Sequence, residues 1–288
     1  MPLAKFMRAL SLLVACLLGT PLLAQTYSFK TLQVPGALST SVWGVNDAGA
    51  MSGYYMDMGN TPHGFLFSGG KLTILNDPKG IATNAYYINN SNVVVGSYAL
   101  ATGFGSGFIY SGGVYTDVGP PQATAGSVAV GINDAGQVVG YFSDQVGEHG
   151  FVYTNGTYTT LDVPGALLTL AGAINNAGLV TVQWVNTAGQ LQASVWNGTR
   201  YLPASVPGAT TSIIHDINNK NQIAYGWLDT NGAEHGALFA AGKFYSPVDD
   251  PAGTNTTILG LNSKGAFVGQ FIPTGATEPA GFSAVVRP

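Results

Sequence analysis

The sequence predicts an all-β protein, a six-bladed β-propeller, and three observations support this prediction. One turn recurs six times along the chain, at intervals of 42 to 44 residues. Each copy lies within a repeat of about 43 residues that reads as four short strands. The chain also begins with a segment that matches the fourth strand of a repeat and ends with one that matches the third. A fixed period in this range is typical of solenoids and propellers.

The repeated turn is represented by "GINDAGQVVGY" at residues 131–141. Its first asparagine recurs as Asn46, Asn89, Asn133, Asn175, Asn218 and Asn262. Its fourth position holds Gly49, Asn92, Gly136, Gly178, Asn221 and Gly265. Glycine and asparagine adopt positive φ most readily, as a type I turn followed by a bulge requires at this point. The first asparagine side chain can accept a hydrogen bond from the backbone two residues further on. We therefore expect a tight hairpin in every repeat.

The rest of each repeat supplies the other strands of a blade. In the third copy, "SVAVGIN" runs into the turn, "QVVGYFS" returns from it, and "FVYTNG" and "TYTTLDV" follow. These strands are more continuously apolar than alternating, so both faces of each sheet should be covered. A four-stranded meander buried on both faces is a propeller blade. The approximate repeats are residues 27–70, 71–113, 114–156, 157–199, 200–242 and 243–288.

The two ends of the chain predict how the ring closes. The segment "TYSFKTLQV" near the start matches a fourth strand, and the final "AGFSAVVRP" matches a third strand. The last blade therefore lacks an outer strand, which residues 27–33 can supply. This exchange leaves no sheet edge unpaired, whereas an open solenoid would gain nothing from it.

The first 24 residues have the layout of a secretory signal peptide. Lys5 and Arg8 precede the apolar run "ALSLLVACLLG", and the small Ala24 marks a cleavage site. Cleavage there would leave a single propeller domain over residues 25–288, secreted or held in the periplasm or at the cell surface. The stretch "LVAC" ending at Cys16 also fits a lipoprotein signal, which would leave a lipidated cysteine instead. No second apolar segment follows, so we expect no membrane span.

With the turn, the "LDVPGA" connector and the "HGFLF" and "HGFVY" steps identified, the chain resembles the HAF-type extracellular repeats of bacterial secreted proteins. The resemblance covers residues 25–288. It departs from the pattern where Val182 and Ala193 replace glycines and where the fifth copy reads "HGALF". It implies a secreted repeat protein without an assigned biochemical role, and it brings no catalytic residues.

Charge and motifs restrict the classes of function. Without Lys5 and Arg8 the chain carries 8 basic and 14 acidic residues and no basic cluster, which argues against nucleic acid as a partner. No nucleophile elbow, phosphate-binding loop or zinc-protease motif is present. His63, His149 and His235 hold one position in alternate blades, too far apart to share a metal ion. We expect no metal, no cofactor and no catalytic residue that the sequence alone can name.

Candidate binding residues fall in two places. The loops between second and third strands and the connectors between blades vary in length and charge, so their common rim is the natural binding face. Two pairs of acidic residues lie there, and a His-Asp pair interrupts an apolar innermost strand; these candidates are Asp144, Glu148, Asp229, Glu234, His215 and Asp216. Loop carboxylates can bind a ligand, support glycoside hydrolysis as a pair, or only shape a turn.

Together these observations favour a secreted binding or interaction module with a glycan or protein ligand on this rim. An extracellular carbohydrate-active enzyme, a glycoside hydrolase or lyase that uses the loop carboxylates, is the alternative. A purely structural repeat protein is a third interpretation. The sequence predicts neither the identity of the ligand nor the oligomeric state.

Overall fold

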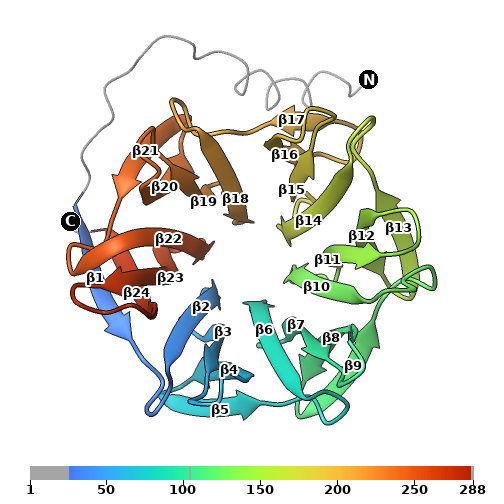
Figure 1. The fold of residues 1–288 in the computed structure, drawn as a ribbon, viewed down its shortest axis with the longest axis horizontal. Coiled ribbons are helices and arrows are strands. Elements are labelled where there is room, and N and C mark those ends of the chain that lie inside the picture. Colours follow the sequence, from blue (N-terminus) through green and yellow to red (C-terminus); the bar gives the residue numbers. More distant parts are fainter. Residues whose placement is uncertain (1–25, 104, 287–288) are drawn as a thin grey trace, which may run out of the picture.

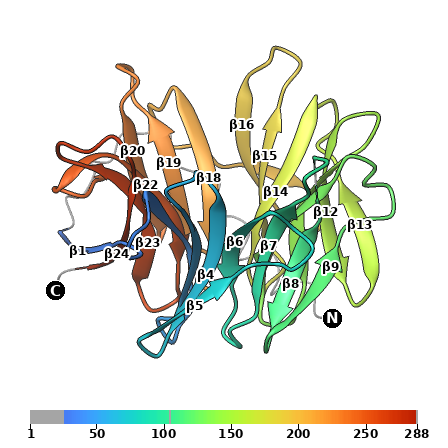
Figure 2. The same ribbon diagram turned by 60° about the horizontal axis from the view of Figure 1, so that its bottom comes forward.

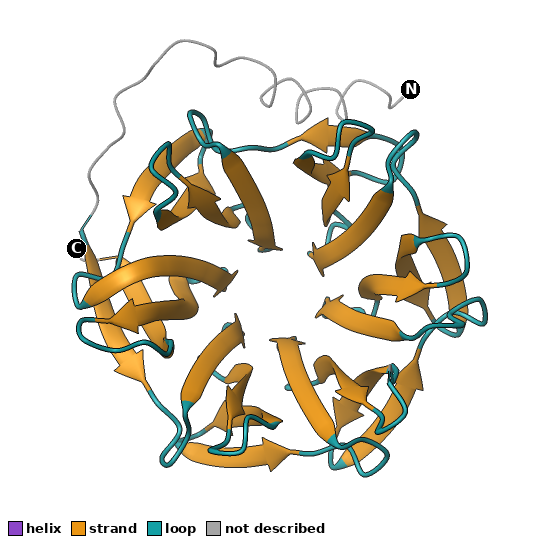
Figure 3. Ribbon diagram, in the orientation of Figure 1, coloured by secondary structure: helices purple, strands orange, loops and turns teal. Residues whose placement is uncertain are grey.

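The computed structural model describes residues 26–103 and 105–286. Six four-stranded antiparallel sheets form a ring (Figure 1), so the predicted six-bladed propeller is confirmed. The described residues contain strands and loops and no helix (Figure 3), and thus none long and apolar enough to cross a membrane. The predicted signal peptide and Cys16 lie outside the described residues.

The strands of each blade follow one another from the centre of the ring outward. The innermost strands are β2 (Ser39–Val45), β6 (Ala82–Ile88), β10 (Ser127–Ile132), β14 (Leu168–Ile174), β18 (Thr211–Ile217) and β22 (Gly253–Leu261). The second strands are β3 (Met51–Met56), β7 (Val94–Ala99), β11 (Val138–Ser143), β15 (Val180–Val185), β19 (Ile223–Leu228) and β23 (Ala266–Pro273). The third strands are β4 (Pro62–Ser68), β8 (Gly107–Ser111), β12 (Glu148–Thr154), β16 (Leu191–Trp196), β20 (Glu234–Ala240) and β24 (Ala280–Val286). The outer strands are β5 (Lys71–Leu75), β9 (Val114–Val118), β13 (Thr157–Leu161), β17 (Tyr201–Pro203), β21 (Lys243–Val248) and β1 (Tyr27–Leu32).

The ring closes as the two ends of the sequence predict. Strand β1 pairs antiparallel with β24 and becomes the outer strand of blade 6 (Figure 1). The Phe29 ring packs edge-to-face against Phe267 and Phe282, with centroids 6.0 and 5.2 Å away. Because each repeat in the sequence starts with an outer strand, each repeat spans two blades. Blade 1 begins at β2.

The repeated turn has the predicted geometry at every copy. The fourth position has positive φ throughout, for example +78° at Gly136 and +59° at Asn92. The Asn133 Oδ1 atom accepts hydrogen bonds from the backbone N–H groups of Ala135 and Gln137, at 3.1 and 3.0 Å. All six turns lie on one side of the ring, which we call the Asn-turn rim; the loops between second and third strands and the connectors form the opposite side, the loop rim. Figure 2 shows the ring in an oblique view, in which the loops at its two sides can be seen.

The first asparagines also link neighbouring blades, which the sequence analysis did not foresee. Each Nδ2 group donates a hydrogen bond to the backbone carbonyl of the equivalent asparagine in the next blade, at 2.9 to 3.2 Å. The sixth bond, from Asn262 to Asn46, returns to blade 1 and closes the circle. These asparagines are all buried. The Asn-turn rim is therefore held by a closed ring of six inter-blade hydrogen bonds.

The repeated Gly-Tyr and His-Gly-Phe steps are two halves of one packing unit. In four blades a second-strand glycine lies directly opposite a third-strand phenylalanine, as Gly140 lies opposite Phe151. A Cβ atom at the equivalent Gly53 would collide with the Ser41 backbone carbonyl and come within 2.8 Å of the Phe65 ring, so the missing side chain leaves room for the innermost strand and for the aromatic ring. The two blades that depart from the repeat change both members together, and their opposed pairs are Val182 with Ser194 and Tyr225 with Ala237. The space between strands is filled either way.

Candidate binding site on the loop rim

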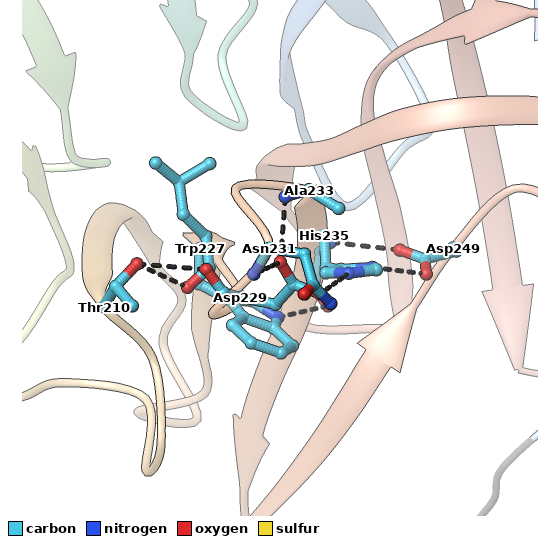
Figure 4. A network of polar contacts seen from close by, with 9 residues as sticks. Thr210, Trp227, Asp229, Asn231, Ala233, His235 and Asp249 are labelled. Carbon is cyan, nitrogen blue, oxygen red and sulfur yellow. Dashed lines mark hydrogen bonds and ion pairs between the residues drawn. The ribbon is translucent and has the colours of Figure 1, made fainter.

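Asp144 and Asp229 shape the loops that carry them. The Asp229 carboxylate accepts hydrogen bonds from the backbone N–H groups of Ala233 and Asn231, at 2.9 and 2.8 Å (Figure 4). Asp144 accepts two such bonds within its own loop, at 2.7 and 3.1 Å. These bonds favour the ionised form and lower the pKa of both carboxyl groups. Both side chains are thus occupied by their own loops, as turn-forming residues are.

A histidine on the third strand braces each of these loops. In blade 5, His235 Nδ1 lies 2.7 Å from Asp249 Oδ2, and its Nε2 lies 3.8 Å from Asp229 (Figure 4). The imidazole ring also packs on Trp227, with centroids 4.9 Å apart. Blades 1 and 3 repeat the arrangement with His63 and His149. Among the described residues no group of three or more His, Cys, Asp and Glu side chains is placed to hold a metal ion.

Glu148 and Glu234 occupy the same position at the start of a third strand but have different surroundings. Glu234 Oε1 accepts a hydrogen bond from the Thr257 hydroxyl of blade 6. Glu148 makes no side-chain hydrogen bond within the described part of the chain. Its carboxylate instead lines a cleft at the junction of blades 2 and 3.

This cleft on the loop rim has a volume of about 420 Å³. Asn84 and Ser97 line it from blade 2, and Tyr141, Ser143 and Glu148 line it from blade 3. It lies beside residues 119–126, the longest connector between two blades. Gly126, the last residue of this connector, also lines the cleft. An amide, two hydroxyl groups, a carboxylate and a tyrosine ring therefore surround one opening.

Several of these groups are available for a ligand. The Asn84 amide, like the Glu148 carboxylate, has no side-chain hydrogen-bond partner within the described residues. Tyr141 is half-buried, and burial raises the pKa of its hydroxyl, with the nearby Glu148 charge adding to the effect. The phenol is thus neutral at physiological pH and can donate a hydrogen bond as well as present its ring.

His215 and Asp216 lie on the innermost strand β18, where Asp216 is buried and His215 is half-buried. Asp216 accepts hydrogen bonds from the backbone N–H groups of Ile217 and Leu261, both at 2.8 Å, and so ties β18 to β22 of the next blade. Burial raises the pKa of Asp216 to about 7 and lowers that of His215 to about 4. The His215 ring packs edge-to-face against Trp43 of blade 1, with centroids 6.2 Å apart.

Near these residues a side chain from blade 2 reaches the backbone of blades 5 and 6 across the centre of the ring. The Tyr87 hydroxyl reaches from blade 2 to the backbone carbonyls of His215 and Leu259, at 2.8 and 2.6 Å. All six innermost strands are bulged at this level. His215 and Asp216 therefore belong to the packing that joins blades at the centre, and the structure does not bring them to the loop-rim cleft.

Of the six candidate residues, only Glu148 lines the cleft. The other cleft residues, Asn84, Ser97 and Tyr141, were not singled out from the sequence because they lie inside predicted strands. A signal was nevertheless present. Where Asn84 stands in blade 2, blades 3, 4 and 5 have Val128, Leu170 and Ile213.

No protein-family model matches the chain, and no curated protein matches it significantly. Solved structures do share its fold. A mutant of the Aleuria aurantia lectin in complex with Fucα1-6GlcNAc is 12% identical with a TM-score of 0.55, over 88% of this chain and 96% of the lectin. The SapL1 lectin in complex with α-methyl fucoside is also 12% identical with a TM-score of 0.55, over 87% of this chain and 95% of that one. A Xanthomonas campestris gluconolactonase is 9% identical with a TM-score of 0.52, over 86% and 87%. At these identities the similarity shows the propeller fold, and function has to be argued from the site.

Proposed function

We propose that this propeller is a carbohydrate-binding protein and that its ligand lies in the loop-rim cleft between blades 2 and 3. The observation that carries the proposal is the position of Asn84 and Glu148, whose side chains have no hydrogen-bond partner among the described residues, beside the Tyr141 ring. A sugar offers hydroxyl groups that amides and carboxylates bind in pairs, and C–H faces that pack on an aromatic ring. The volume of about 420 Å³ suits one or two sugar rings. Lectins with this fold are consistent with the proposal.

The same cleft favours binding over hydrolysis. Glycosidases use two carboxyl groups that flank the bond to be cleaved, about 5 to 9.5 Å apart. Among the described residues that line the cleft, Glu148 alone carries a carboxyl group. The carboxylates of Asp144 and Asp229 are engaged in their own loops. A protein ligand remains a second interpretation of the rim, and a glycan screen separates the two.

The test is a glycan array probed with residues 25–288, followed by calorimetric titration of the best glycan and of methyl α-L-fucoside. Glu148→Gln should weaken binding at least tenfold, because a hydrogen bond to a charged group contributes about 1.5 to 3 kcal/mol. Glu234→Gln is the matched control, since it holds the same strand position outside the cleft and keeps an oxygen for Thr257. Equal affinities of the two variants would place the ligand elsewhere. Release of a hydrolysed product in a parallel assay would favour the enzyme.

We also infer that the chain is exported and cleaved after Ala24. The basic and apolar pattern of the first residues supports this inference, and the resemblance to HAF-type repeats agrees with it. Mass spectrometry of the exported protein tests it directly. A product beginning at Gln25 is expected. A product that begins with a lipid-modified Cys16 would establish the lipoprotein alternative.

A further inference from the structure

A second pocket, of about 300 Å³, lies where the chain enters blade 1. Its walls are apolar: Val42 and Phe65 are buried, and Met51, Phe67 and Leu72 are half-buried. The connector that follows β1 forms one side of it through residues 33–35. The pocket is separate from the loop-rim cleft and shares no residue with it.

Comparison of the six blades shows why this space is open. One position of the outer strand, opposite the same position of the third strand, carries an aromatic ring in five blades. These rings belong to Phe29, Tyr115, Tyr158, Tyr201 and Phe244. In blade 1 the same position, opposite Phe67, holds Leu72.

Blade 3 shows where a ring at this position lies. The Tyr158 hydroxyl of blade 3 accepts a hydrogen bond, at 3.1 Å, from the backbone N–H of Gly119, the first residue after the preceding outer strand. In blade 4 burial raises the pKa of Tyr201, and the charge of Asp162, again the first residue after the preceding outer strand, adds to this effect. The corresponding residue before blade 1 is Gln33, which lines the pocket. The pocket thus corresponds to the space that the Tyr158 ring fills in blade 3.

We propose that this pocket binds a single phenol-type ring supplied by a ligand. The apolar walls provide the burial that a planar ring requires, and an apolar cavity of about 150 Å³ already admits benzene. The backbone at Gln33 corresponds to the donor that holds the Tyr158 hydroxyl in blade 3. The ring can belong to a small free phenol or to a tyrosine side chain of another protein, and both present the same chemistry to the pocket.

Titration with p-cresol, followed by calorimetry and by ligand-observed NMR, tests the proposal. We expect one site on the wild-type protein. Leu72→Tyr should fill the pocket and weaken binding at least tenfold, and Leu72→Phe should do the same if the first variant folds poorly. Leu167→Tyr is the control, because Leu167 is exposed on a loop away from the pocket and its replacement should leave binding unchanged.

A gain of binding provides the stricter test. Tyr158→Leu should open the same space in blade 3 and raise the number of p-cresol sites from one to two. Absence of p-cresol binding at millimolar concentration, or undiminished binding by both Leu72 variants, would overturn the proposal. A site number that stays at one in Tyr158→Leu would also overturn it. N-acetyl-tyrosinamide, run in parallel, distinguishes the sources: comparable binding indicates that a tyrosine side chain fits, and binding of p-cresol alone restricts the site to small phenols.

Discussion

The closed ring of asparagines predicts that Asn133→Asp is destabilising even though it keeps the turn. Aspartate retains the oxygen that accepts the N–H groups of Ala135 and Gln137. It loses the Nδ2 donor, which lies 3.2 Å from the Asn175 carbonyl and 2.8 Å from Gln137 Oε1, and places a carboxylate oxygen beside those acceptors instead. Asn133 is only 3% exposed, so we expect a loss of about 2 to 3 kcal/mol at pH 7. Part of it should return below the carboxyl pKa, because a protonated carboxyl group can donate to the Asn175 carbonyl.

Asn186 on the loop rim provides a matched control. Its Oδ1 accepts two backbone hydrogen bonds, from Ala188 and Gln190 at 3.0 and 2.9 Å, as Asn133 does in its own turn. Its Nδ2 donates only to the neighbouring Gln190 side chain and reaches no other blade. Asn186→Asp should therefore cost less than about 0.5 kcal/mol. Urea denaturation at pH 7 and pH 4 measures both variants, and equal losses at pH 7 would refute the argument that the inter-blade donor is what matters.

Three further predictions follow from the fold. Deletion of residues 27–32 leaves β24 as an exposed edge, so the protein should aggregate or melt without cooperativity; an unchanged melting temperature would contradict this mode of closure. Gly136→Val forces a β-branched residue to a φ of +78° and should cost about 1 to 2 kcal/mol, whereas Gly136→Asn should be milder, as measured by thermal melts; equal losses would show that φ is not decisive. Burial holds the pKa of His215 at about 4, so neutral His215 contributes stability above its unfolded pKa of about 6.5 that is lost as pH falls toward 4. The wild-type free energy of unfolding relative to His215→Leu should thus rise by about 2 to 3 kcal/mol between pH 4 and 6.5, and a pH-independent difference would show that His215 is not buried in its neutral form. Asp216, whose pKa is raised to about 7, contributes with the opposite sign over a similar range and is common to both proteins.

The architecture was predictable because its signals are repeated. A single "NDAG" turn would be weak evidence, but six copies at a nearly constant interval leave few alternatives. The mismatch of the two chain ends carried as much information. A spare fourth strand at the start and a missing fourth strand at the end predict that the first strand completes the last blade. The pairing of β1 with β24 confirms this.

The candidate site was less predictable because it depends on positions where one repeat differs from the others. Asn84 is a polar residue inside a strand, and its availability depends on the neighbouring blade leaving room. Sequence reasoning instead selected loop carboxylates, which are conspicuous but serve their own turns at Asp144 and Asp229. The phenol pocket follows the same rule, since Leu72 is unremarkable until the other five outer strands are aligned with it through the structure.

The two rims differ in whether the first residue of the turn must be asparagine. The same turn geometry occurs on both rims, because Asp57, Asn186 and Asp229 each accept two backbone N–H groups in loops of the loop rim. Aspartate and asparagine alternate freely there, since only an acceptor oxygen is needed. On the Asn-turn rim the first residue is asparagine in all six copies, because its amide must also donate to the next blade. The turn alone would allow aspartate at this position, but the hydrogen bonds between blades require asparagine. The loop rim has no such requirement, so its sequence can change and a ligand site can arise there.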